Sequence, residues 1–77
     1  VRVSRLDLRV PASISGLYNE IDEAWGRLHV VVNNAAVCHY APFEEIDLDD
    51  WDETLETNAR GTFLMTRGAL PLLRESQ

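Results

Sequence analysis

The chain has 77 residues, of which 45% are hydrophobic and 26% charged, as expected for one small globular domain. Its net charge of −6 argues against nucleic acid or an anionic membrane as a partner, and no apolar run is long enough to cross a bilayer. Cys38 is the only cysteine, which excludes an intrachain disulfide and favours a reducing, cytoplasmic location. The chain does not begin with methionine, and we interpret it as an internal piece of a longer protein.

The first half of the chain predicts a strand, a helix and a second strand. Val1–Leu8 is a short, imperfectly alternating strand, and Pro11–Trp25 carries an apolar stripe at helical spacing. Pro11 suits the first helical position, although Val10 before it is a poor N-cap. Gly26 is expected to end the helix in the left-handed conformation, and Leu28–Val32 is the second strand. Two strands joined by a helix imply a parallel sheet.

The second half predicts a loop and one long helix. Val37–Asp47 has no clean period and is expected to be a loop with one helical turn at most. Asp49 or Asp50 is expected to cap the helix, with Glu53 placed for a capping box, and the helical pattern continues to Glu75.

Pro71 lies inside this helical pattern, so a kink is expected near Arg67 to Gly68. The buried face of the helix is expected to comprise Leu55, Ala59, Thr62, Phe63, Thr66, Ala69, Leu70 and Leu73.

The second predicted strand ends in a candidate ligand-binding segment. Its unbroken apolar run, Val30 to Val32, is typical of a strand buried on both faces. Asn33 and Asn34 follow directly, and ligands of open α/β sheets bind at the carboxyl ends of the strands. The alternative is that the two amides only terminate the strand.

Three segments carry a resemblance to a known family. Leu28–Ala36 resembles the strand and Asn-Asn-Ala-Gly segment of the short-chain dehydrogenase/reductase family, with Ala36 in place of the glycine. Asp7-Leu8 resembles the family's Asp-Val pair, and Trp51–Pro71 resembles its long central helix, including Asn58. The resemblance implies an α/β, doubly wound Rossmann-type parallel sheet. Residues 1–77 would be a strand-helix-strand-helix piece of a single NAD(P)-binding domain, from its third strand to its central long helix.

The resemblance also implies a set of cofactor-binding residues. The carboxylate of Asp7 would accept a hydrogen bond from the adenine amino group of NAD or NADP. The backbone N–H of Leu8 would donate a hydrogen bond to a nitrogen of the adenine ring. Asn34 and Ala35 would line the adenosine half through backbone groups, beside Asn33, which would brace neighbouring strands. The alternative for Asp7 is an ordinary acidic residue in a turn.

Asn58 is the one candidate catalytic residue. By resemblance it helps to bind a water in a proton relay to a Tyr-x-x-x-Lys pair; the alternative is an exposed or helix-kinking asparagine. The chain itself holds no such pair, because Asp22 and Glu44 stand four residues after Tyr18 and Tyr40. It also has no Gly-rich phosphate-binding turn, so the 77 residues alone are expected to be inactive.

No metal site is expected. His29 and His39 are interpreted as structural or solvent-facing, and no spacing matches a zinc site. Trp25 and Trp51 are expected to be packing anchors. The acidic run is interpreted as a solvated face; it comprises Glu44, Glu45, Asp47, Asp49 and Asp50.

The expected function is that of a fragment of an NAD(P)-dependent oxidoreductase, which moves a hydride between nicotinamide and a small-molecule carbonyl or alcohol. Family resemblance implies a homo-oligomer, either a dimer or a tetramer. Two alternatives remain: a non-catalytic dinucleotide-binding or regulatory relative of the same fold, and an interaction module without a cofactor.

Overall fold

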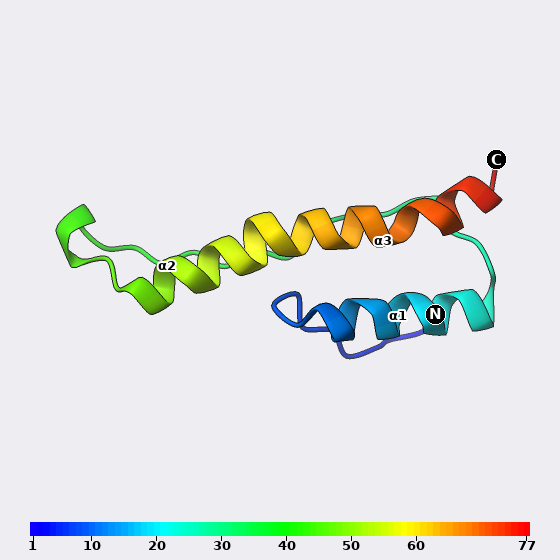
Figure 1. The fold of residues 1–77 in the computed structure, drawn as a ribbon, viewed down its shortest axis with the longest axis horizontal. Coiled ribbons are helices and arrows are strands. Elements are labelled where there is room, and N and C mark those ends of the chain that lie inside the picture. Colours follow the sequence, from blue (N-terminus) through cyan, green and yellow to red (C-terminus); the bar gives the residue numbers. More distant parts are fainter.

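A long helical rod with a second helix packed beside it dominates the structure, a computed structural model that describes all residues 1–77 (Figure 1). The molecule measures 47 × 21 × 20 Å. None of its helices is both long and apolar enough to span a membrane. The elements in chain order are α1 (Pro11–Ala24), η1 (Phe43–Glu45), α2 (Leu48–Leu55), η2 (Glu56–Gly61) and α3 (Thr62–Glu75).

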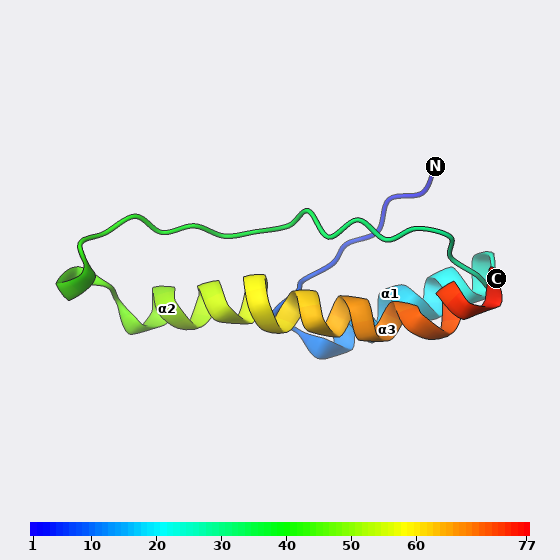
Figure 2. The ribbon, with the colours of Figure 1, turned by 90° about the horizontal axis from the view of Figure 1, so that it is seen from above.

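The rod consists of α2, η2 and α3, which follow one another without a break; η2 is π-helical. α1 packs against α3, and residues 28–42 then run in an extended form along the whole rod to η1 (Figure 2). The N-terminal residues 1–8 form a second extended segment.

Both predicted strands are extended, but neither forms a β-strand, so that part of the prediction is not met. A strand needs a neighbour about 4.8 Å away to exchange ladder hydrogen bonds, and neither segment has one. Val30 and Val32 are 73% and 80% exposed, while Val31 packs on the core. The apolar run is therefore covered on one face rather than on two.

α1 confirms the sequence prediction closely. It begins at Pro11 after Val10, which makes no side-chain cap, and it ends one residue before Trp25. Gly26 has φ +70°, as expected for the left-handed residue that ends a helix, and its N–H donates to the carbonyl of Ile21.

The small core lies where α1 crosses α3. Its buried members are Ile14, Tyr18, Ala69 and Leu72. The hydroxyl of Tyr18 donates to the carbonyl of Met65 at 2.6 Å, so the polar end of this ring is satisfied.

The start of the rod differs from the prediction. Asp47, rather than Asp49 or Asp50, is the N-cap, and its carboxylate accepts from the N–H of Asp49 at 2.8 Å. With the cap at Asp47, Glu53 lies too far into the helix to complete a capping box. The single helical turn expected in the preceding loop is confirmed as η1.

The buried face of the rod was predicted only in part. Thr57, Gly61, Ala69 and Leu72 are buried, whereas Leu55, Phe63 and Leu70 are exposed. A π-helical turn accommodates an extra residue and rotates the face downstream of η2, which accounts for Phe63 and Leu70, whereas Leu55 lies before η2.

Two further expectations concern Pro71 and the two tryptophans. α3 stays helical through Pro71, and the departure from α-helical geometry lies earlier, at η2. Trp25 and Trp51 are 59% and 52% exposed, so they are not packing anchors in this structure.

We predict that Gly68→Ala destabilises the protein while Gly16→Ala does not. A Cβ at Gly68 would lie 2.8 Å from two ring carbons of Tyr18, and such overpacking costs about 1–3 kcal/mol. A Cβ at Gly16 meets nothing within 4 Å, so the helix propensity of alanine should add roughly 0.5–1 kcal/mol. Denaturant unfolding of the full-length protein measures both changes, and a stabilising Gly68→Ala would contradict the observed packing.

Candidate functional site

An open groove of about 600 Å³ lies between the N-terminal turn, the extended segment after Ala35 and the junction of α2 with η2. These three segments are far apart in the sequence. The residues that line the groove are Arg5, Leu6, Asp7, Leu8, Arg9, Ala35, Ala36, Val37, Glu53 and Thr57.

The turn at Asp7 is held by local hydrogen bonds. The Oδ1 atom of Asp7 accepts from the N–H of Arg9 at 2.9 Å, and the N–H of Asp7 donates to the Ser13 hydroxyl at 2.9 Å. The carbonyl of Asp7 accepts from the N–H of Val10 at 3.1 Å. The second carboxylate oxygen of Asp7 and the backbone N–H of Leu8 make no hydrogen bond in the structure and remain available to a ligand.

Two arginines attach this turn to η2. The Nε atom of Arg9 lies 2.9 Å from Glu56 Oε2, and the hydrogen bond with Glu56 is the main cause that raises the pKa of Arg9. Arg60 donates to the carbonyl of Arg9 at 2.8 Å. The charge of Glu56 is therefore compensated, whereas Glu53 lines the groove without a basic partner at ion-pair distance, apart from His39.

Asn58 holds the opposite wall of the groove. Its Oδ1 accepts from the N–H of Val37 at 2.8 Å, and its Nδ2 donates to the carbonyl of Val37 at 2.7 Å. One side chain thus satisfies both backbone groups of one residue in an extended segment that has no sheet partner. One amide hydrogen and one lone pair of Asn58 stay free for a further partner such as water.

Two more contacts fix the extended segment along α3. The N–H of Leu28 donates to the carbonyl of Leu72 at 3.0 Å. The side-chain amide of Asn33 donates to the Thr66 hydroxyl at 3.3 Å, so Asn33 bonds to the helix here and not to a strand.

The structure therefore brings some of the predicted site residues together. Asp7, Leu8 and Ala35 line one groove, and Asn58 holds its edge through Val37. Asn33 and Asn34 are exposed and lie outside the lining residues.

Neither tyrosine has the electrostatics of a catalytic base. Burial raises the pKa of Tyr18, and a hydrogen bond with the Cys38 thiol raises the pKa of Tyr40. A tyrosine that exchanges protons with substrate near neutral pH needs the opposite shift.

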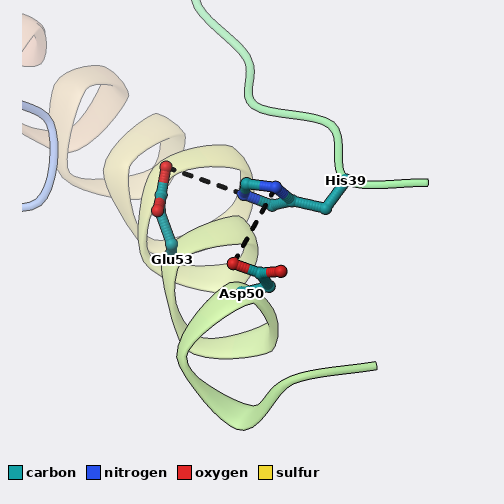
Figure 3. Close-up of side chains that lie close together, drawn as sticks. All are labelled: His39, Asp50 and Glu53. Atoms are coloured by element: carbon teal, nitrogen blue, oxygen red, sulfur yellow. Dashed lines mark ion pairs between the residues drawn. The ribbon is translucent and has the colours of Figure 1, made fainter. Parts of the chain in front are cut away.

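A cluster of His39, Asp50 and Glu53 went unnoticed in the sequence (Figure 3). Asp50 and Glu53 are three residues apart and share a face of α2, and this spacing can be recognised in the sequence. His39 comes from an extended segment whose register against α2 has no sequence signature.

Several known proteins are similar to this chain over most of its length. A family described as enoyl-(acyl carrier protein) reductase matches residues 1–77. The short chain dehydrogenase mpl6 of Monascus purpureus is 42% identical over 69 residues, which cover 88% of this chain and 24% of that protein. The chain belongs to the short-chain dehydrogenase/reductase family. The D-threitol dehydrogenase of Mycolicibacterium smegmatis, another similar protein, is 42% identical over 59 residues, 77% of this chain and 23% of the relative.

Solved structures of this family superimpose well on the chain. The RhlG/NADP active-site complex of Pseudomonas aeruginosa gives a TM-score of 0.85 at 31% identity, over 92% of this chain and 28% of that one. A short-chain dehydrogenase from Burkholderia cenocepacia in complex with NADP gives 0.83 at 29% identity, over 90% of this chain and 28% of that one. The chain spans about a quarter of the length of its relatives.

We predict that Asn58→Leu in the full-length protein frees the segment around Val37. Two hydrogen bonds of about 0.5–1.5 kcal/mol each are lost, so amide exchange at Val37 should accelerate by roughly 5- to 150-fold. Asn33→Leu is the matched control, because it removes a single longer bond from the same segment. If exchange at Val37 is unchanged in Asn58→Leu, the two hydrogen bonds from Asn58 to Val37, which we call the Asn58 clamp, do not hold the segment.

Proposed function

We propose that the full-length protein is an NAD(P)-dependent oxidoreductase that moves a hydride between nicotinamide and a carbonyl or alcohol carbon. Residues 1–77 would supply the adenosine half of its cofactor site, as part of one Rossmann domain. The observation that supports this proposal most is the convergence of Asp7, Leu8 and Ala35 on one groove. Two of the similar solved structures are complexes with NADP, which supports the choice of cofactor.

The free polar groups of the groove match the edge of adenine. Asp7 has an unused carboxylate oxygen that can accept from the adenine amino group, and Leu8 has an unused N–H that can donate to a ring nitrogen. Ala35 and Ala36 are small, so the opposite wall leaves room for a flat ring. Asn34 would approach the ribose from the rim.

The groove has mixed charge, with Asp7 and Glu53 beside Arg5, while Arg9 is already engaged by Glu56. The nucleoside end of the cofactor is therefore assigned from the free polar groups that match adenine. The pyrophosphate cradle and the Tyr-Lys pair would come from other parts of the protein. When bound, the cofactor supplies the hydride; the residues of this chain orient its adenosine, and Asn58 would place a water through its free amide hydrogen and lone pair.

The same proposal assigns a place to the two extended segments. Residues 1–8 and 28–32 would be the third and fourth strands of a parallel sheet, separated in the order 3-2-1-4-5-6 by the first two strands. The protein would act in the cytoplasm on a small molecule, as a dimer or tetramer and without a nucleic-acid or membrane partner. The 77 residues alone would not turn over substrate.

We predict that Asp7→Ala in the full-length protein raises the Kd for NAD(P)H roughly tenfold, because it removes one hydrogen bond to adenine worth about 1–1.5 kcal/mol. Ser13→Ala is the control, since it loosens the same turn but keeps the carboxylate. Its Kd should stay within about twofold of the wild type in a fluorescence titration. Equal losses in both variants would mean that Asp7 acts only through the turn.

We predict that Asn58→Leu lowers kcat by about tenfold or more and leaves the NAD(P)H Kd near its normal value, because a water of the proton relay is lost. Steady-state rates with a carbonyl substrate and a cofactor titration separate the two effects. Weakened cofactor binding with normal kcat would contradict the assigned role. A full-length protein that binds NAD(P)H without turning over any carbonyl or alcohol would instead favour a non-catalytic relative.

A further inference from the structure

We propose that His39, Asp50 and Glu53 form a binding site for a divalent transition-metal ion of the Zn²⁺ class. One ligand atom from each of the three side chains lies within 4.8 Å of the other two (Figure 3). Two of the side chains belong to α2, and the third crosses over from the extended segment, so a bound ion would tie the two elements together.

The separations fit an ion better than direct hydrogen bonds. The Nδ1 atom of His39 is 3.9 Å from Asp50 Oδ1, and its Nε2 atom is 3.7 Å from Glu53 Oε1. Both distances exceed the hydrogen-bond range. The two carboxylates face different ring nitrogens of His39, so one ion would be bound by one of these nitrogens and the other carboxylate would turn toward it. Donors bonded to one tetrahedral ion at about 2.1 Å stand roughly 3.4 Å apart, and all three side chains are exposed enough to rotate to such positions.

The local charge also favours a cation. No lysine or arginine occurs between Arg27 and Arg60, so the carboxylates on and before α2 have no basic neighbour in the sequence. This stretch holds eight of the thirteen acidic residues of the chain: Glu44, Glu45, Asp47, Asp49, Asp50, Asp52, Glu53 and Glu56. Of these, Glu56 pairs with Arg9, whereas Asp50 and Glu53 have no arginine at ion-pair distance and lie within 4 Å of the imidazole of His39 only.

The donor set selects the kind of ion. Imidazole nitrogen together with carboxylate oxygen suits Zn²⁺ and its neighbours, whereas Mg²⁺ and Ca²⁺ prefer oxygen alone. Three protein ligands leave a coordination position for water. A hollow of about 140 Å³ beside His39 and Asp50, bordered by Trp51 and Thr54, gives that position room.

Such an ion would fix the loop that follows the groove. His39 is two residues beyond Val37, where the Asn58 clamp ends, and Glu53 also lines the groove. Metal binding would therefore extend the attachment of the loop from η2 to α2 and compensate the free carboxylate of Glu53.

Isothermal titration of the untagged, chelator-treated full-length protein with ZnCl₂ tests the site. We expect one ion per chain, and a Kd at least tenfold higher in each of His39→Gln, Asp50→Asn and Glu53→Gln. His29→Gln and Asp49→Asn are matched controls, a histidine and a neighbouring aspartate outside the cluster, and should stay within about twofold of the wild type. Wild-type affinity in His39→Gln, or equal losses in the controls, would overturn the proposal.

Limited chymotrypsin digestion gives a second readout. Tyr40 and Phe43 are 94% and 87% exposed, so the loop should be cut readily without metal. Zn²⁺ should slow this cleavage in the wild type, a chelator should reverse the protection, and His39→Gln should show none. MgCl₂ at the same concentration should not protect. Protection that survives His39→Gln would show that the ion binds elsewhere.

Discussion

The two hydrogen bonds between the Asn58 amide and the backbone of Val37 are the constraint that joins the end of the extended segment to the rod beside the candidate site. Within residues 1–77 no strand lies beside residues 28–42, and side chains of the rod hold this segment in place. Asn58 does this at the point where Ala35 and Ala36 face the turn at Asp7. Without these two bonds the stretch around Val37 would be free, while the hydrogen bonds of Leu28 and Asn33 to α3 would still hold the residues before Ala35.

The other wall of the groove, the turn at Asp7, is held by charged side chains rather than by an amide. The ion pair of Arg9 with Glu56 and the hydrogen bond from Arg60 both join the Asp7 turn to η2. Gly61 permits this approach, since a Cβ there would lie 2.9 Å from the Cβ of Leu8. The π-helical segment η2 thus contacts both walls of the groove, because it carries Glu56, Asn58, Arg60 and Gly61. Irregular helical turns of this kind frequently occur at functional sites.

Local patterns predicted the helices well because their causes are local. The apolar stripe, Pro11 and Gly26 defined α1 almost to the residue. The two strands were predicted from the same kind of pattern, but a β-ladder depends on a neighbour that no local pattern supplies. The extended segments are present and the ladder is not.

The candidate site, like the fold, was predicted only in part. Family resemblance pointed to Asp7, Leu8 and Ala35, which share a groove. The buried face of the rod was misjudged because an extra residue in η2 rotates it, and no residue type announces a π-helical turn. His39 was interpreted as structural or solvent-facing because its approach to α2 follows from the contact of Asn58 with Val37, which spans 21 positions of sequence.

A crystal structure of the full-length protein with bound NADP(H) tests the central claim most directly. We expect the adenine ring in the groove, with its amino group within hydrogen-bond distance of the Asp7 carboxylate and a ring nitrogen facing the N–H of Leu8. Residues 1–8 and 28–32 should be strands of one parallel sheet with two others between them. Adenine bound away from the groove, or these two segments paired directly with each other, would contradict the proposed site and its place in the fold.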